Sequence, residues 1–422
     1  MDQNINEEHK LDENDHRRLG QELDLFVMSE LVGSGLPLFT PRGTVLRDEL
    51  AKYSNELREN LGFAKVWTPH ITKDELYKIS GHWDKFGSEL FLVKSQETKD
   101  NLVLKPMNCP HHIQIYASSP RSYRDLPIKL LETTTDYRDE KTGELQGLSR
   151  VRSITQDDSH VFCSLGQIEE SIDELIGAAK EMYKTLNMGL KFRLSFRDSG
   201  EGYLGDPKLW DKAQKTMEKI AKGSGLEYFV GEGEAAFYGP KIDFMASDVL
   251  DRTWQVATVQ LDFVQPERFK LSYIGDNGEE IQPVMIHCAL LGSVERFLAV
   301  YIEHTSGKFP VWLAPEQVRI ITLNDEDSIL KLAENVVKKG REAGIRLRLD
   351  NSNESVGKKI REAEVMKVPY AVVIGPKEAE SGQVLPRVRK DLGTEPKAPL
   401  EIEEFLRKVA AESQGRAGQT SL

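Results

Sequence analysis

The segment Arg150–His160 carries a polar side chain at almost every second position. If it is a β-strand, its side chains alternate between the two faces of a sheet. Such a row is costly to bury without partners, so we expect it to line a cleft that binds phosphates at one end and a metal or an amine at the other. The row consists of Arg150, Arg152, Ile154, Gln156, Asp158 and His160.

Composition places the chain among globular proteins of ordinary polarity. Its 422 residues are enough for two or three domains, and 39% of them are apolar, 29% are charged and the formal net charge is −12. No apolar run is long enough to cross a membrane, and the acidic N-terminus lacks the apolar core of a signal peptide. Three cysteines are too few for a disulfide framework. We expect a cytoplasmic protein without indiscriminate polyanion binding, although a local basic patch stays open.

The first three quarters of the chain predict an α+β unit. A polar arm is expected over 1–18 and a large unit over 19–312, in which strands are joined mostly by hairpins. This pattern favours a mainly antiparallel sheet with helices packed on it. The expected helices lie within 15–28 and at 43–61, 168–186 and 294–303, and the expected strands lie at 62–71, within 128–162 on either side of the loop 139–147, and at 191–197, 241–247, 253–263 and 282–290.

The pattern changes near Pro310 to Pro315, where strands and helices begin to alternate. This alternation is typical of a small α/β domain, which we expect over 315–410, with a frayed tail over 411–422. Its expected strands are 318–323, 346–350, 370–374 and 384–389, and its expected helices are 328–343, 356–366 and 400–411.

A hairpin around Arg138 supplies a second row of polar groups. Its first strand ends at Arg138, and its loop adds Glu140. Beside Arg150, these residues would form a floor with several guanidinium groups, which match phosphate and carboxylate oxygens bidentately. The alternative is a solvated sheet face with ion pairs, and the terminal Gln-Asp-Asp-Ser-His favours the functional interpretation.

Cys109, His160 and His287 lie in three separate segments and together offer a thiolate and two imidazoles. That set suits Zn²⁺ and leaves a fourth coordination position open. Their wide spacing gives no local signal, so buried core histidines remain the alternative. Two glycine turns are further candidates: Gly292 opens a helix with Arg296 in its first turn, which favours anions, and 231–241 lets backbone approach a ligand. Each could equally be a plain connection.

Together these segments resemble the three motifs of class II aminoacyl-tRNA synthetases, at 62–71, 138–160 and 292–297. The texts Lys-Pro-Met-Asn-Cys-Pro at 105–110 and Phe-Tyr-Gly-Pro-Lys at 237–241 resemble the threonyl-tRNA synthetase family in particular. So do Arg150-Val-Arg152 and Thr-Gln-Asp-Asp at 155–158. The resemblance covers about 15–408. It implies a class II catalytic domain over 19–312 and an anticodon-binding domain over 315–410.

The resemblance also implies a role for each candidate residue. Cys109, His160 and His287 match the ligands of one zinc ion per chain, which in that family binds the amino and hydroxyl groups of threonine. Asp158 matches the residue that accepts the threonine hydroxyl. His82 matches a residue near the site of acyl transfer. The remaining threonine-site matches are Met107, Arg138, Gln156, Tyr238 and Lys241.

The implied ATP site uses the guanidinium floor. Arg138 and Gln156 match groups near the carboxylate and the α-phosphate, Arg150 and Arg296 match clamps on the outer phosphates, and Glu140 matches the adenine contact. Ile154 would suit the adenine ring, and Arg152 has no assigned role. Gln260 and Ser293 complete the implied ATP-site matches.

The resemblance implies ATP-dependent ligation of threonine to tRNA(Thr), with Mg²⁺ accompanying ATP. A homodimer through 62–71 is implied, as are anticodon contacts by Arg387 and Arg389, although the segment 384–391 is shorter than the family pattern. The catalytic region begins near residue 20, and we find no His-x-x-x-His of the editing domain. We therefore expect no correction of seryl-tRNA by this chain and allow for a separate editing protein.

Three other functions compete with this interpretation. A regulatory paralogue that binds tRNA or an mRNA mimic should have lost Arg138, Arg296 or a zinc ligand, and none is lost. A ligase for a carrier protein would not need the domain after Pro315. A sister enzyme for proline is disfavoured by Cys109 with the two histidines, whereas serine and threonine remain to be separated by assay.

Overall fold

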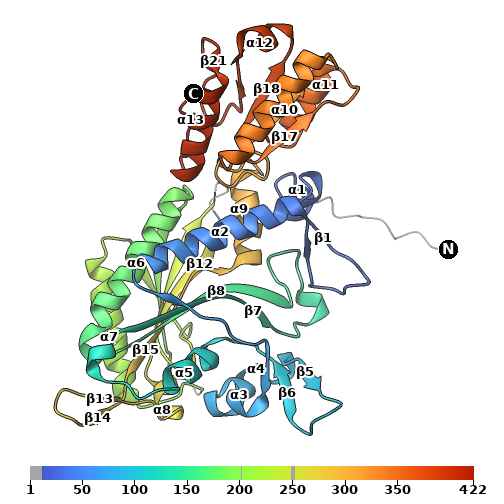
Figure 1. The fold of residues 1–422 in the computed structure, drawn as a ribbon. Helices are drawn as coiled ribbons and strands as arrows, with labels where there is room; N and C mark the ends of the chain where they lie inside the picture. Colours follow the sequence, from blue (N-terminus) through green and yellow to red (C-terminus); the bar gives the residue numbers. More distant parts are fainter. Residues whose placement is uncertain (1–11, 201, 249–251) are drawn as a thin grey trace. The chain divides into compact units, whose positions relative to one another are not determined.

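The computed structural model describes residues 12–200, 202–248 and 252–422. Within them the chain forms two compact units (Figure 1). One unit combines Glu30–Leu36 with Ala51–Val300, and the other combines the described residues before Glu30 with Pro37–Leu50 and Tyr301–Leu422. Two of the four divisions fall inside helices, in α2 (Pro41–Glu59) and α9 (Val294–Thr305).

The first unit is built on an eight-stranded sheet. Neighbouring strands from β9 to β7 run antiparallel, and only the edge strands β10 and β3 pair in parallel, which confirms the predicted antiparallel α+β fold. In spatial order the strands are β10 (Tyr228–Glu232), β9 (Gly189–Phe196), β11 (Lys241–Ser247), β12 (Thr253–Asp262), β15 (Val284–Ser293), β8 (Ser153–Cys163), β7 (Ile128–Tyr137) and β3 (Ala64–Lys65).

Two amphipathic helices, α6 (Ile168–Thr185) and α7 (Pro207–Gly223), pack against this sheet (Figure 1). Helix α7 was not predicted, although Asp206 caps it, Pro207 begins it, and its buried residues recur at helical spacing. The unit also contains helices α3 (Asp74–Ser80), α4 (His82–Phe86), α5 (Cys109–Ala117) and α8 (Val264–Arg268), a sheet of β4 (Ile71–Lys73), β6 (Asn101–Leu104) and β5 (Leu92–Lys94), and the pair β13 (Tyr273–Ile274) and β14 (Glu280–Ile281).

Two predicted strands begin or extend differently in the structure. The strand predicted from Arg150 begins only at Ser153, because the backbone N–H of Arg152 donates to the carbonyl of Gly35 rather than to a strand neighbour. The strand predicted over 62–71 shrinks to β3, followed after a gap by β4. Pro69 lies in that gap and cannot donate to a ladder.

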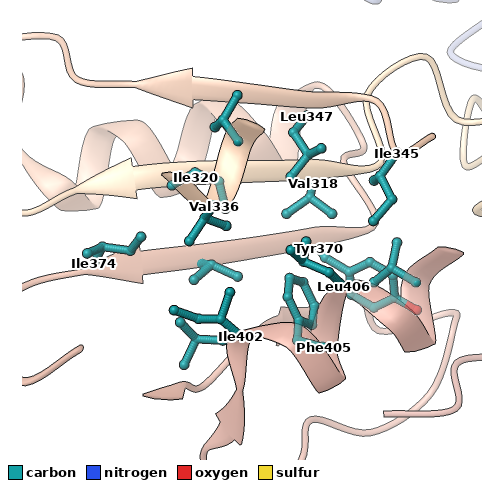
Figure 2. Packing of buried hydrophobic residues seen from close by; sticks show 14 of the residues in the cluster. Val318, Ile320, Val336, Ile345, Leu347, Tyr370, Ile374, Ile402, Phe405 and Leu406 are labelled. Carbon is teal, nitrogen blue, oxygen red and sulfur yellow. The ribbon is translucent and has the colours of Figure 1, made fainter. Parts of the chain in front are cut away.

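The second unit contains a four-stranded sheet in the order β17 (Leu347–Asp350), β16 (Val318–Thr322), β18 (Tyr370–Ile374) and β20 (Arg387–Val388). Strands β17, β16 and β18 are parallel, and the two central ones, β16 and β18, are buried over nearly their whole length, as expected for strands covered on both faces. Figure 2 shows side chains of α10 (Asp327–Glu342) and α13 (Ile402–Gln414), such as Val336 and Phe405, packing against Val318 and Tyr370. Helix α11 (Val356–Val365) and the short α12 (Pro376–Ser381) complete the alternation.

The ends of this unit differ from the predictions. The strand predicted over 384–389 is divided at Leu385–Pro386 into β19 (Gln383–Val384), which pairs with β21 (Leu400–Glu401), and β20, which pairs with β18. The tail is ordered rather than frayed, because Ser421 donates through its backbone N–H and hydroxyl to the carboxylate of Glu412.

The N-terminal residues also differ in part from the predictions. The arm predicted over 1–18 falls partly on residues 1–11, outside the described chain. The end of that predicted arm is helical, because α1 (His16–Glu22) begins within it. Strands β1 (Phe26–Val27) and β2 (Leu38–Phe39) form a small pair. In the described residues, no helix combines the length and apolarity needed to cross a membrane.

A buried carboxylate holds the centre of the large sheet. Asp157, on β8, accepts hydrogen bonds from the backbone N–H groups of Leu290 and Leu291 on β15, each at 3.0 Å. Its Oδ2 also accepts the hydroxyl of Ser54, and the same oxygen lies 3.6 Å from a guanidinium nitrogen of Arg58 on α2. Both charged side chains are fully buried. The interaction therefore connects a helix and two central strands.

We predict that Asp157→Ala lowers the free energy of unfolding by about 3–5 kcal/mol, because it leaves the buried Arg58 charge without its carboxylate. Urea denaturation of the purified chain measures the change. The matched control is Lys219→Ala, which breaks the exposed pair with Glu169 and should leave the denaturation midpoint unchanged. Equal midpoints for the two variants would contradict the role given to Asp157.

Candidate active site

A cavity of about 560 Å³ opens over the polar face of the β7–β8 hairpin. This volume lies in the range of pockets that hold a nucleotide-sized ligand. Its walls also include the end of β15 and the start of α9, so residues far apart in the sequence line the same cavity. Seven of the predicted ATP- and substrate-site residues line it: Arg138, Glu140, Arg150, Ile154, Gln156, Ser293 and Arg296.

The register of the hairpin explains why these residues meet. Asp136 pairs with Ile154, Thr134 with Gln156, and Glu132 with Asp158, so that these side chains share one face. The adjacent strand β15 places Ser293 opposite Gln156 after a register shift. The predicted polar face is therefore present from Ile154 to His160.

The cationic groups of the cavity differ in how they are paired. Arg150 forms ion pairs with Glu140 at 2.7 Å and with Glu144 at 2.6 Å. Arg138 and Arg296 have no carboxylate within 4.0 Å among the residues that the structure describes. Desolvation, and then the nearby charge of Arg150, lower the pKa of Arg296. An anion in the cavity would relieve this repulsion and meet two unneutralised guanidinium groups.

Arg152 leaves the predicted row. Its guanidinium donates to the backbone carbonyl of Glu140 at 2.9 and 3.1 Å and lies 3.4 Å from the carboxylate of Asp139. It also reaches the carbonyl of Ser34. Arg152 thus fastens the loop that carries Glu140 instead of lining the cavity.

The three predicted metal ligands come together in the structure. The ligand atoms of Cys109, His160 and His287 all lie within 4.8 Å of one another, and all three side chains are buried. Cys109 begins helix α5, whereas His160 and His287 face each other across β8 and β15, with Nε2 of the first 3.0 Å from Nδ1 of the second. Ligand nitrogens around one Zn²⁺ are roughly 3.3 Å apart, so the set fits such an ion.

The pKa shifts within the cluster are also consistent with a bound metal ion. Burial raises the pKa of the Cys109 thiol, and the neighbouring carboxylates Asp158 and Asp262 raise it further. Burial lowers the pKa of His160, so its imidazole is neutral. A divalent cation would favour the thiolate and needs neutral imidazoles, which this environment provides.

Both predicted ligand histidines have a second partner that the sequence did not reveal. Nε2 of His287 lies 2.8 Å from the carboxylate of Asp262, and Nδ1 of His160 lies 2.8 Å from Nδ1 of His112. Such contacts orient a ligand ring toward its metal. In the sequence, the adjacent histidines at 111 and 112 were the one indication of such a second partner. Asp262 gave none, because it ends a strand whose pattern has no unusual feature.

The residues predicted to surround the amino acid lie around this cluster. Tyr238 stacks on His287 with ring centroids 4.9 Å apart, and its hydroxyl donates to Gln260 at 2.6 Å. Lys241 lies opposite Gln260 in the sheet and pairs with the buried Asp243 at 3.0 Å. The same carboxylate accepts from two cavity-lining residues, Gln255 and Thr258.

Met107 connects the cavity with the cluster. Its sulfur lies 3.0 Å from a guanidinium nitrogen of Arg138, and its carbonyl accepts the hydroxyl of Tyr77. His82 points Nε2 at the Cys109 sulfur, 3.7 Å away, and burial lowers its pKa to about 3. His82 is therefore a neutral group beside the cluster.

Asp136 lies on the same face, as the alternation of side chains along the first hairpin strand predicts. It is fully buried, and neither carboxylate oxygen has a hydrogen-bond partner in the described part of the chain. Burial, and then the charge of Asp158, raise its pKa to about 7. A carboxyl group of this kind is neutral or negative at physiological pH according to small changes around it.

The predicted anticodon residues lie in the second unit. Arg387 is exposed on β20. Arg389 is engaged, because its guanidinium donates to the carbonyls of Lys367 and Phe309 and pairs with Asp391 at 2.7 Å. This geometry favours a structural role for Arg389 over base reading, for which it was predicted.

The match to known domains covers both units of the chain. Residues 91–305 match the tRNA synthetase class II core domain (G, H, P, S and T), and residues 317–412 match the anticodon binding domain.

The chain belongs to the class II aminoacyl-tRNA synthetases.

Several members of this family are similar over nearly the whole chain. The threonine–tRNA ligase of Gloeobacter violaceus is 46% identical over 96% of the chain, and that of Chloroherpeton thalassium is 46% identical over 90%. The chain spans 65% and 59% of the length of these two relatives. The crystal structure of the RNA binding domain of threonyl-tRNA synthetase from Cryptosporidium parvum Iowa II has a TM-score of 0.89 and 34% identity, covering 96% of this chain and 99% of that one.

A more distant solved structure shows the fold alone. Giardia lamblia prolyl-tRNA synthetase in complex with prolyl-adenylate has a TM-score of 0.72 and 18% identity, covering 95% of this chain and 80% of that one. The predicted class II fold is therefore confirmed.

We predict that Asp136→Asn gains stability over the unmodified synthetase chain as the pH rises. The folded carboxyl keeps its proton up to about pH 7 while the unfolded one loses it near 3.8, so stability falls between these values. The stability advantage of the variant should grow by about 3 kcal/mol between pH 5 and pH 8. The cost of keeping the buried carboxyl protonated rises by about 1.36 kcal/mol for each pH unit between pH 5 and about pH 7. Urea midpoints at both pH values test this, and a constant difference would contradict it. Exposed Asp173→Asn is the control.

Proposed function

We propose that the chain is a threonine–tRNA ligase, which activates threonine with ATP and transfers it to the 3′ end of tRNA(Thr). One observation supports this most: the cavity with two unneutralised arginines is joined through Arg138 and Met107 to a buried Cys/His/His cluster. Asp158 lies beside that cluster on the same strand, with its carboxylate 3.6 Å from Nδ1 of His160. The named relatives support the same assignment.

In the activation step, a carboxylate oxygen of threonine attacks the α-phosphorus of ATP. The bond to the bridging oxygen breaks, which gives threonyl-adenylate and pyrophosphate. This reaction needs positioning and charge neutralisation more than covalent help. Arg138 would hold the carboxylate and α-phosphate, while Arg296 with Mg²⁺ would hold the outer phosphates. Arg150 could join them once ATP draws it from Glu140 and Glu144.

Selection of threonine is assigned to the cluster and Asp158. Cys109, His160 and His287 would hold Zn²⁺, which when bound offers an open position to the amino and hydroxyl groups of the substrate. Asp158 would accept the proton of the threonine hydroxyl in a hydrogen bond. Valine has no hydroxyl and leaves these polar groups unpaired, so it should be rejected. Serine has one, and its correction would fall to a separate editing protein.

In the transfer step, a hydroxyl of the terminal ribose attacks the threonyl carbonyl and AMP leaves. His82, neutral and adjacent to Cys109, is the residue we propose nearest this step. The second unit would bind the anticodon, with exposed Arg387 as a candidate contact.

We also propose a cytoplasmic homodimer through the segment 62–71. The exposed Trp67 and Ile71, at 77% and 48% accessible, support an interface there. Sedimentation of the purified chain tests this proposal.

We predict that ATP–pyrophosphate exchange by the purified chain requires an amino acid with a β-hydroxyl group. Threonine should support exchange, serine should support it more weakly, and valine should not, because the cluster and Asp158 discriminate by that group. Exchange that is independent of threonine, or strongest with proline, would overturn the assignment.

We further predict that Arg296→Ala lowers the rate constant of exchange by about 100- to 1,000-fold, because one fixed charge on the outer phosphates is lost. Steady-state exchange with saturating threonine measures this effect. The matched control is Arg124→Ala, an exposed arginine outside the cavity, which should leave exchange unchanged. A similar loss in both variants would contradict the role of Arg296.

A further inference from the structure

The outer partners of the cluster form a continuous line of hydrogen bonds whose direction can be assigned. Asn108 is the starting point, because its amide oxygen lies 3.0 Å from the ammonium group of Lys105 and 2.9 Å from the hydroxyl of Thr68. Since an ammonium group only donates, this oxygen is assigned, and the amide nitrogen must face the other side. There it lies 3.0 Å from Nε2 of His112 and 3.0 Å from a carboxylate oxygen of Glu132.

The direction of the line follows from that amide. Nε2 of His112 accepts from Asn108, so Nδ1 carries the proton of the neutral ring and donates to Nδ1 of His160. Nε2 of His160 then carries its proton and points at Nδ1 of His287, 3.0 Å away. His287 ends the line by donating from Nε2 to Asp262. In this direction Nε2 of His160 has no lone pair for a metal.

Glu132, which lies beside Asn108, offers His112 a second hydrogen-bond acceptor. A carboxylate oxygen of Glu132 lies 3.4 Å from Nε2 of His112, the same atom that Asn108 approaches. Glu132 is buried and is fixed by the backbone N–H of Thr68 at 2.7 Å and by the hydroxyl of Thr68 at 2.9 Å. Thus His112 has a donor and an acceptor beside one ring nitrogen, and the two favour opposite tautomers.

We propose that Glu132, acting through His112, is the positioning residue that turns His160 into a metal ligand. With the proton of His112 on Nε2 and directed at Glu132, Nδ1 of His112 accepts from Nδ1 of His160. Nε2 of His160 is then free to bind the ion. When the ion binds, the proton on Nε2 of His160 is released to solvent water, the proton on Nδ1 of His112 crosses to Nδ1 of His160, and Nε2 of His112 takes up one proton from water. Both rings remain neutral.

The environment of Glu132 supports this role. Burial alone would raise its pKa, but the neighbouring His112, the hydrogen bonds from Thr68 and the charge of Lys105 lower it to about 2. The carboxylate is therefore ionised and able to hold a donor at physiological pH. Asp262 holds His287 in the corresponding way, but directly, at 2.8 Å. The two ligand histidines thus have a carboxylate behind them, one of them through an intervening ring.

The test is the zinc affinity of the full-length chain, measured by competition with a chromophoric chelator in the absence of ATP and threonine. Glu132→Gln should raise the zinc dissociation constant about 10- to 100-fold, because an amide nitrogen facing His112 keeps Nε2 as an acceptor. Asp262→Asn should weaken binding to a similar extent. Circular dichroism confirms that each variant is folded.

His112→Phe and His111→Phe form the matched pair. Both are buried histidines of α5, but neither ring nitrogen of His111 has a hydrogen-bond partner among the described residues. The first substitution should weaken zinc binding and the second should not. Unchanged affinity in Glu132→Gln, or equal losses in the matched pair, would overturn the proposal. Because it rests on the proposed zinc site, failure of the unmodified chain to bind zinc would overturn that site as well.

Discussion

The polar face of the β7–β8 hairpin depends on a carboxylate that faces away from it. Asp157 is flanked along β8 by Gln156 and Asp158, and since strand side chains alternate, it points to the opposite side of the sheet. There it holds the backbone of β15 and, with Arg58, the helix α2. A one-residue slip of β8 would move every polar group of the site to the wrong face, and this buried tie makes such a slip costly.

Because Asp157 fixes the register of β8 from one face, the opposite face can carry polar and charged side chains. The β7–β8 hairpin carries Glu132, Asp136 and Asp158 in one layer; burial raises the pKa of Asp136 and of Asp158, and the charge of Asp158 raises that of Asp136 further. A sheet without another source of stability would not retain such a surface. Here the opposing side packs against α6 and holds the register, so the polar row can be selected for chemistry.

The sequence was sufficient where the signal was periodic or local. Strands β11 and β18 have the predicted bounds, and the polar face from Ile154 to His160 follows from alternation alone. Arg152 departed from the row because a loop far along the chain, at Gly35, takes its backbone N–H, and alternation carries no information about such a partner. Helix α7 was missed although its cap and spacing were readable, so that failure was one of interpretation rather than of information.

The candidate metal ligands show the other limit. Nothing near Cys109 indicates that a thiol and two imidazoles meet, because the cluster is created by the pairing of β8 with β15 and by the start of α5. The second partners of the ligands are equally non-local, with Asp262 on β12 and Glu132 on β7. Burial, and then the charges of Asp158 and Asp262, raise the pKa of the thiol, and these two carboxylates would stabilise a positive charge at this place. The candidate site is thus a property of the sheet order, which no single segment of the sequence shows by itself.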